Sequence, residues 1–293
     1  MDFVKPVGLD QKIEEATKAL ELNKPVCLYG PTGTGKTIAA WEIAQAISKE
    51  LGNKVIYIQM YPEVTKNVLI GGETIKNGNI VVDTGPIIKL GGSDTKGGAT
   101  FIVDEVTHAT EPALLGFNSL IESPFQTVVG AKVHIMHDKT RFLFAGNTPD
   151  HAGNVALPAS FANRLYIVDF PSPEEAHLQA ILDGTVGVPP GDALRPLQNF
   201  VLSIAVKSRS AFFAVSPRNI INCIEMLKQY TNTGFEQTSN LDNVPNEIVN
   251  AMKGAKINPA LVRATILATM LGNVVTKNDG PDKVKALLWE EAK

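Results

Sequence analysis

The stretch Gly30-Pro-Thr-Gly-Thr-Gly-Lys-Thr37 decides the fold, and it follows directly on the apolar run PVCLY at residues 25–29. It matches the pattern G-x-x-x-x-G-K-[ST] of phosphate-binding loops. In such a loop the glycines let successive backbone N–H groups turn toward phosphate oxygens, the lysine reaches the terminal phosphates and the hydroxyl ligates Mg²⁺. We therefore predict that Lys36 contacts the β- and γ-phosphates and that Thr37 ligates the metal. The predicted binding loop as a whole is Gly30, Pro31, Thr32, Gly33, Thr34, Gly35, Lys36, Thr37 and Ile38.

On either side of this loop, strand-like and helix-like patterns alternate. Helical patterns cover about 10–22, 38–51 and 111–122, and strand-like apolar runs stand at 25–29, 54–60, 99–105, 126–136, 140–147 and 165–170. A strand, a phosphate loop, a helix and a second strand form a βαβ unit. Strands that alternate with helices favour a parallel sheet covered by helices on both faces, which is an α/β fold.

The pattern changes after Phe170, where PSPEE at 171–175 is a proline-flanked break with a helix-start signal. Beyond it no run is typical of a strand of comparable quality. We predict an α/β nucleotide-binding domain over 1–170 and a small all-α domain over 171–293. Its helices are expected near 173–183, 193–208, 217–230, 245–254, 259–272 and 282–292.

Composition and charge exclude several classes of protein. The chain has 293 residues, of which 44% are hydrophobic and 19% charged, so it is neither disordered nor a disulfide scaffold. A net charge of −3 gives no general attraction to nucleic acid or to an acidic membrane. The two cysteines, Cys27 and Cys223, lack metal-ligand spacing, and we expect reduced thiols. Without an apolar run of membrane-spanning length or an N-terminal signal pattern, we expect a cytoplasmic protein with no membrane partner.

FIVDE at 101–105 is a strand pattern that ends in two carboxylates. We predict that Asp104 holds Mg²⁺ through water and that Glu105, just past the strand end, polarises the attacking water as general base. The plain alternative is a solvated strand terminus. Taken alone the short sequence is a weak signal, and its combination with the phosphate loop makes it a strong one.

Asn147 follows the apolar strand FLFAG and is expected at the carboxyl edge of the sheet, where open α/β sheets collect their ligands. An amide there orients the attacking water, although a turn role in GNTPD explains Asn147 equally well. Arg164, at the end of the expected short helix in LPASFANRL, is placed to reach a neighbouring subunit's γ-phosphate. Arg218 opens a helix after Pro217 and is placed to cap the same phosphate. For either arginine alone, a surface salt bridge is the default explanation.

These elements, in this order, resemble the AAA+ ATPases. GPTGTGKT at 30–37 is similar to Walker A, FIVDE to Walker B, Asn147 to sensor 1, Arg164 to the arginine finger and Arg218 to sensor 2. The resemblance covers about residues 1–230. It is strongest to the MoxR branch, which includes RavA-, CbbQ- and GvpN-like proteins and is related to the dynein and midasin modules. The segments that carry it are LIGG at 69–72, GNIVVDTGPIIKL at 78–90, the helix-and-hairpin-like ALLGFNSLIESPFQTVVGAKVHIM at 113–136, and LPASFANRL at 157–165.

This resemblance implies a P-loop NTPase sheet followed by a helical lid, a homo-oligomeric ring that is usually a hexamer, and ATP with Mg²⁺ bound between subunits. It also implies remodelling of a protein client, often together with a von Willebrand factor A partner. The stretches near 68–72 and 128–136 would then face the pore or the ring surface. Hydrolysis would use Glu105 and Asn147 to orient water, with Lys36, Arg218 and the neighbour's Arg164 stabilising charge on the phosphates.

The sequence departs from the family pattern at three places. Asn163 replaces the usual acidic residue before the finger, His108 in VTHAT has no assigned role, and VLIGG at 68–72 has no aromatic residue of the kind used for threading.

Three other functions stay open. One is a small-molecule kinase, which the scarcity of arginine and the paired carboxylates disfavour. Another is a nucleotide-dependent switch or scaffold without turnover. The third is a DNA-associated motor, which the net charge disfavours.

Overall fold

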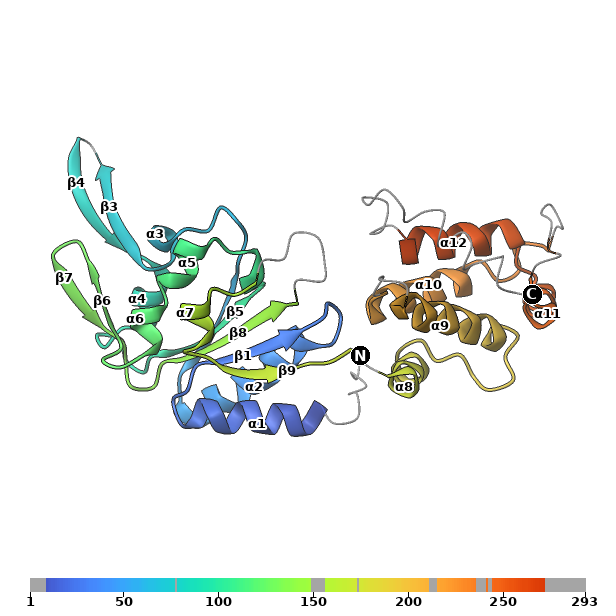
Figure 1. Cartoon of the computed structure of the whole chain (residues 1–293), viewed down its shortest axis with the longest axis horizontal. Helices are drawn as coiled ribbons and strands as arrows, with labels where there is room; N and C mark the ends of the chain where they lie inside the picture. The colour runs from blue at the N-terminus through green and yellow to red at the C-terminus, as the bar shows by residue number, and fades with distance from the viewer. Residues whose placement is uncertain are drawn as a thin grey trace. The chain divides into compact units, whose positions relative to one another are not determined.

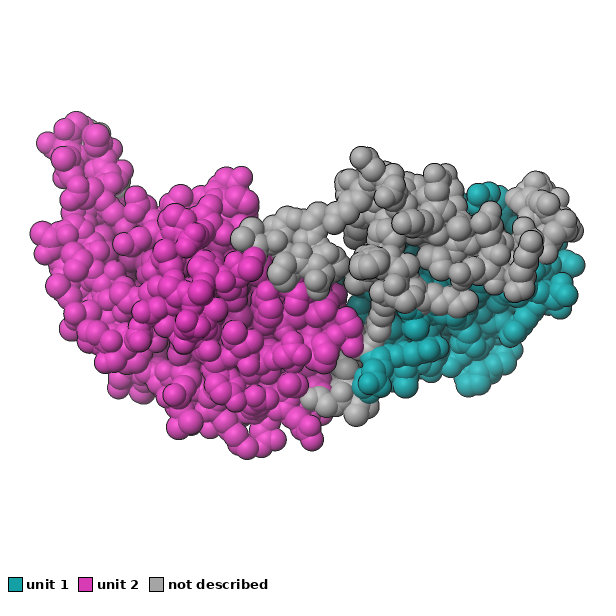
Figure 2. Space-filling model, in the orientation of Figure 1, with its two compact units in different colours: residues 1–7, 173–293 teal, residues 8–172 magenta. Residues whose placement is uncertain are grey.

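The computed structural model describes residues 9–76, 78–148, 156–172, 174–210, 215–235, 241 and 244–271. The chain forms two compact units: residues 8–172, which we call the α/β unit, and residues 1–7 together with 173–293, which we call the helical unit (Figure 2). The predicted helix at 282–292 lies outside the described residues.

The α/β unit is built on a five-stranded parallel sheet in the order β2-β5-β8-β1-β9 (Figure 1). Every neighbouring pair in it is parallel. All strand carboxyl ends therefore meet at one edge, and in the register of the sheet Gly30 lies opposite Asn147. The predicted α/β fold is confirmed. The strands are β1 (Val26–Gly30), β2 (Lys54–Gln59), β5 (Ala99–Asp104), β8 (Arg141–Asn147) and β9 (Tyr166–Asp169).

Helices cover both faces of this sheet, because the central strands are apolar on both sides. One face packs on α1 (Leu9–Glu21) and α2 (Lys36–Leu51), with a core that includes Leu28, Ile43 and Leu143. The other face packs on short helices through a cluster of phenylalanines that come from both the strands and the helices. These helices are α3 (Lys66–Leu69), α4 (Pro86–Gly91), the 3-10 turn η1 (Val106–His108), α5 (Glu111–Leu115), α6 (Asn118–Ile121) and α7 (Ala159–Ala162). The phenylalanines are Phe101, Phe117, Phe142, Phe144 and Phe161.

Two antiparallel hairpins stand outside the main sheet and extend from the same side of the α/β unit (Figure 1). The first joins β3 (Gly71–Lys76) to β4 (Asn79–Thr84), and the second joins β6 (Gln126–Val129) to β7 (Lys132–Ile135). They approach each other closely, since a Cβ at Gly130 would lie 2.5 Å from Val82. The pattern at 126–136 was expected to alternate with helices in the sheet. It instead forms the separate hairpin that the family resemblance implied.

One local feature was not predicted, and one expectation is corrected. The glycine-spotted stretch at 71–84 carries the β3–β4 hairpin, which periodicity did not predict. The helical pattern expected over 111–122 is divided into α5 and α6, because the chain leaves regular helix at Gly116 and Phe117. The break seats Phe117, which is fully buried, among the other phenylalanines.

The helical unit contains five helices among its described residues. They are α8 (Glu175–Thr185), α9 (Arg195–Ser210), α10 (Pro217–Gln229), α11 (Asn246–Gly254) and α12 (Pro259–Leu271). Their apolar faces form one core, which includes Leu197, Ile220 and Ile266. Asp183 on α8 links this helix to α9 by accepting hydrogen bonds from Arg195 and Gln198. None of the helices in the described part of the chain combines the length and apolarity needed to cross a membrane.

Candidate nucleotide-binding site

The loop between β1 and α2 is shaped as an anion cradle. Gly33 and Gly35 have φ angles of 81° and 90°, a left-handed conformation that side chains disfavour. Gly30 has no room for a side chain, because a Cβ there would lie 2.0 Å from the carbonyl oxygen of Phe170. The loop ends at the N-terminus of α2, a helix of 16 residues, where free backbone N–H groups and the helix dipole favour a phosphate.

Lys36 lies in this cradle with only 7% of its surface exposed. Its Nζ donates hydrogen bonds to the carbonyl oxygens of Gly30 at 2.9 Å and Pro31 at 2.6 Å. Burial lowers the pKa of Lys36 to about 8, against the opposing effect of the Glu105 and Asp104 carboxylates. Its third partner is the Thr34 hydroxyl at 3.5 Å. A buried cation whose hydrogen-bond partners are all neutral oxygens gains strongly from an anionic ligand.

Asp104 and Thr37 form the candidate metal position. The Thr37 hydroxyl donates to Oδ2 of Asp104 at 2.9 Å. Because its proton points to the carboxylate, the hydroxyl oxygen keeps its lone pairs for a cation, and the neighbouring negative charge favours one. Hard oxygen donors of this kind suit Mg²⁺, which binds through few protein ligands and keeps waters and phosphate oxygens as the others. The residues fit the metal. The described residues contain no group of three or more His, Cys, Asp or Glu side chains that could hold a metal ion.

Glu105 and Asn147 are brought together at the same edge of the sheet. Asn147 is buried, and its Nδ2 donates to Oε2 of Glu105 at 2.7 Å. The backbone of Glu105 is left-handed, with φ 58°, which costs a non-glycine residue free energy and is concentrated at functional positions. His108, one turn further on, places Nδ1 3.5 Å from the same Oε2. The carboxylate is thus held in place while about 30% of the side chain stays exposed.

The two predicted arginines are placed differently. Arg164 follows α7 and donates to the carboxylate of Glu122 and to the carbonyl oxygen of Ser160, so within one chain it forms the surface ion pair that was its alternative explanation. Arg218 lies exposed in the first turn of α10, in the helical unit. The α/β unit therefore assembles Lys36, Thr37, Asp104, Glu105 and Asn147, and the roles of both arginines stay predictions.

Three residues at this edge were not found from the sequence. The hydroxyl of Tyr57 on β2 donates to Oδ2 of Asp104 at 3.1 Å, and its pKa is raised to about 12 by burial and by that carboxylate. The Thr107 hydroxyl accepts a hydrogen bond from the backbone N–H of Asn147 at 3.2 Å, and His108 approaches Glu105 as described. A tyrosine inside an apolar strand carries no local signal of such a role. His108 and Thr107 could have been suspected only from their position directly after the paired carboxylates.

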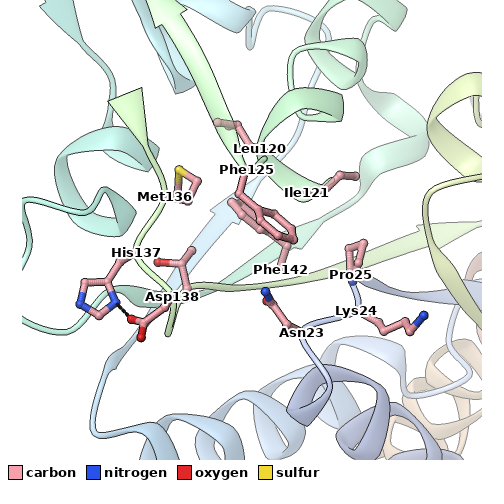
Figure 3. A pocket seen from close by; sticks show the side chains of 11 residues that line it. Asn23, Lys24, Pro25, Leu120, Ile121, Phe125, Met136, His137, Asp138 and Phe142 are labelled. Carbon is pink, nitrogen blue, oxygen red and sulfur yellow. Dashed lines mark ion pairs between the residues drawn. The ribbon is translucent and has the colours of Figure 1, made fainter. Parts of the chain in front are cut away.

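A small cavity lies at the opposite, amino end of the sheet and is a different feature (Figure 3). Its volume is about 50 Å³, which is room for a water or two rather than a nucleotide. Apolar side chains that include Phe125 and Phe142 line it, together with His137 and Asp138, which form an ion pair at 2.6 Å.

The α/β unit resembles known proteins. The AAA domain family of the dynein-related subfamily matches residues 25–165. The uncharacterized protein YojN of Bacillus subtilis is 27% identical over 168 residues, which cover 54% of this chain and 51% of that protein. Midasin of Giardia intestinalis is 24% identical over 186 residues, which cover 62% of this chain and 4% of midasin. The chain thus spans about half the length of YojN and a small part of midasin.

A solved structure of NtrX from Brucella abortus covers 83% of this chain and 55% of its own, at 15% identity and a TM-score of 0.49. At this score the similarity supports no inference about function. The family match includes the phosphate loop, both carboxylates and Asn147, and it ends at Leu165. Residues 25–165 of this chain are therefore an AAA domain of the dynein-related subfamily.

Proposed function

We propose that this protein binds ATP with Mg²⁺ at the carboxyl edge of its parallel sheet and hydrolyses it, and that it does so in a MoxR-like ring that remodels a protein client. The observation that carries the proposal is the convergence of a buried lysine, a hydroxyl–carboxylate pair and an amide-held glutamate at the end of three neighbouring strands. These are the parts that phosphoryl transfer to water requires.

Each residue has a part in the proposed reaction. Lys36 binds the β- and γ-phosphates in place of its present carbonyl partners. Thr37 and Asp104 hold the cation, which when bound neutralises charge that develops on the phosphate oxygens. Asn147 orients a water and Glu105 accepts its proton while the water oxygen bonds to the γ-phosphorus. The bond from that phosphorus to the β-phosphate oxygen breaks, and ADP and phosphate leave.

The side chains of Asn147 and Glu105 are hydrogen-bonded to each other in the structure. Both side chains must therefore reorient toward the attacking water when the nucleotide is bound. The 30% exposure of the Glu105 side chain leaves room for that water.

In a ring, a neighbouring subunit supplies further positive charge at the γ-phosphate. In this proposal Arg164 of one subunit leaves Glu122 and contacts the γ-phosphate held by its neighbour, and Arg218 is the second arginine that stabilises this phosphate. Arg164 lies on the surface with about a third of its side chain exposed, as a group that acts across an interface must. The site between subunits rests on the family resemblance.

The two hairpins are the proposed contact with the client. Both carry large apolar side chains that are well exposed, although polar residues are usual on free surfaces. A von Willebrand factor A protein is the partner class that the resemblance suggests. The exposed apolar residues on these hairpins are Ile75, Ile80, Val81, Val82, Val128, Val133 and Ile135.

Two measurements on the same purified protein test the proposal. Light scattering gives the mass with and without Mg²⁺ and a slowly hydrolysed ATP analogue, and phosphate release is followed with ATP alone. We expect a nucleotide-dependent shift to a ring mass together with phosphate release in the absence of any acceptor. Release only when a small-molecule acceptor is added would favour a kinase, and a ring without release would favour a switch. A rate that rises with DNA would favour a DNA-associated motor.

A further inference from the structure

Tyr57 stands beside the candidate metal position without a role in the proposed reaction. It lies on β2, an edge strand of the sheet, and its hydroxyl donates to Oδ2 of Asp104 at 3.1 Å. The contact joins residues 47 positions apart in the sequence, so it depends on the pairing of β2 with β5. Packing alone does not require the hydroxyl, since phenylalanine would fill the same space.

The Asp104 carboxylate accepts three hydrogen bonds that together fix its orientation. Oδ2 receives the Thr37 hydroxyl at 2.9 Å and the Tyr57 hydroxyl at 3.1 Å, and Oδ1 receives the backbone N–H of Glu105 at 2.9 Å. The Glu105 N–H directly follows β5, the strand that bears the carboxylate, and Thr37 belongs to the phosphate loop. Tyr57 is the contribution of a separate strand, and it holds Oδ2 from the side of β2.

The ring of Tyr57 is itself held by a stacking contact. Trp41 on α2 lies over it with ring centroids 5.7 Å apart and planes 15° from parallel. Both rings stay partly exposed, Trp41 at 38% and Tyr57 at 40%, so a core does not immobilise them and the stack is what restrains the tyrosine. Because Trp41 lies on the helix that begins with Lys36 and Thr37, the phosphate loop, the stack and Asp104 form one connected arrangement.

We propose that Tyr57 is a positioning residue for the cation: its hydroxyl, held by the stack on Trp41, fixes the Asp104 carboxylate in the orientation that receives the Mg²⁺ of the nucleotide complex. This inference rests on the proposed function. Partners that orient a metal ligand typically change metal affinity by roughly 10- to 100-fold when removed. The expected effect is on the metal-dependent part of nucleotide binding, because Tyr57 does not contact the phosphate loop itself.

The variant Tyr57→Phe removes the hydroxyl and keeps the ring that stacks on Trp41. Tyr166→Phe is the matched control, because the Tyr166 hydroxyl also donates to a carboxylate, Oε1 of Glu15 at 2.9 Å. Tyr166 lies on β9, the edge strand on the other side of the sheet from β2. Calorimetry measures the dissociation constant of a slowly hydrolysed ATP analogue in Mg²⁺ and again in a chelator. The ratio of the two constants is the gain in affinity due to the metal.

We expect Tyr57→Phe to reduce this gain by roughly tenfold and to leave the affinity in chelator unchanged, and we expect Tyr166→Phe to change neither. The Mg²⁺ concentration that gives half-maximal phosphate release should rise in Tyr57→Phe alone. An unchanged gain in Tyr57→Phe, with wild-type protein that shows a gain, would overturn this inference and leave the proposed function standing. Wild-type protein that binds no nucleotide would overturn both.

A second variant separates the hydroxyl from the packing of the rings. Trp41→Leu removes the stack and keeps the Tyr57 hydroxyl, so we expect a smaller reduction of the metal-dependent gain than in Tyr57→Phe. A larger reduction in Trp41→Leu would show that ring packing, and not the hydroxyl, sets the carboxylate, which contradicts the proposal.

Discussion

Two buried cations stand at opposite ends of the same sheet, Lys36 at the carboxyl edge and Arg141 at the amino edge, and both are 7% exposed. Both donate to backbone carbonyls. Arg141 bonds to the carbonyl oxygens of Leu20 and Asp138 at 2.7 Å and to that of Thr140 at 3.0 Å, and it thereby ties α1 to the start of β8. Burial lowers the pKa of each, and acidic neighbours oppose the shift.

The difference between them lies in what surrounds each charge. Lys36 sits on a loop with left-handed glycines, at a helix N-terminus, and faces two carboxylates, so an anionic ligand and its cation can replace its present partners. Arg141 is enclosed by three carbonyls, from the end of α1 and from the turn before β8, and has no such loop. A buried cation therefore indicates a binding site only where its partners can be exchanged.

The largest effect is expected from Lys36→Ala. Loss of the charge-assisted contacts to the phosphates should lower ATP affinity by roughly a thousandfold, and thermal stability should stay unchanged or rise, because a buried cation is removed. Equilibrium binding and a thermal scan measure the two quantities. Lys49→Ala, in the exposed last turn of the same helix, is the control and should change neither. Stability lost without any loss of affinity would erase the contrast with Arg141.

Arg141→Met should have the opposite profile. It leaves three carbonyl groups without their donor at the buried edge of the sheet, so the free energy of unfolding should fall by about 3 kcal/mol. ATP affinity should stay within a factor of about two at temperatures where the variant is folded, because the substitution is at the far end of β8. Denaturant titration and calorimetry test this. A variant as stable as wild type would show that the arginine does not tie α1 to β8.

Asn147→Ala should affect turnover rather than binding or stability. Without its amide, the attacking water and the Glu105 carboxylate lose their orientation, and phosphate release should slow by roughly a hundredfold while affinity changes little. Steady-state phosphate release at saturating ATP measures the effect. Equal losses in rate and in affinity would mean that Asn147 is a turn residue that supports the loop, its alternative explanation.

The smallest effect is expected at the two cysteines, Cys27 on β1 and Cys223 on α10. Burial raises the pKa of Cys27 to about 12 and that of Cys223 to about 11. Because both values lie above pH 9, the thiols stay protonated between pH 7 and 9, and a thiol reagent should modify neither until the protein unfolds. Labelling followed by mass determination tests this. Rapid labelling of folded protein that increases with pH would contradict the burial of the labelled cysteine, Cys27 on β1 or Cys223 on α10.

The sequence predicted the sheet and the central site because both depend on local patterns. Apolar runs such as FLFAG marked the buried strands, and the glycines of the phosphate loop are required by the left-handed angles observed at Gly33 and Gly35. Asp104 and Asn147 could be placed together because parallel strands end at one edge.

Other features depend on contacts that no local pattern records. The β3–β4 hairpin exposes consecutive apolar residues, including Ile80, Val81 and Val82, so it lacks the alternation of a half-buried strand. Arg164 was assigned a partner in another subunit, and Glu122, its partner within the chain, lies 42 residues away in the sequence. The contact of Tyr57 with Asp104 arises only when β2 pairs with β5.

Glu105→Gln shows most directly whether the carboxyl edge of the sheet hydrolyses ATP. Phosphate release and ATP affinity are measured together for wild type, Glu105→Gln and Glu111→Gln, an exposed control in the first turn of α5. We expect Glu105→Gln to bind ATP within a few-fold of wild type and to release phosphate at least roughly a hundredfold more slowly, because the amide cannot accept the proton of the water. The control should match wild type. Full turnover by Glu105→Gln would contradict the account.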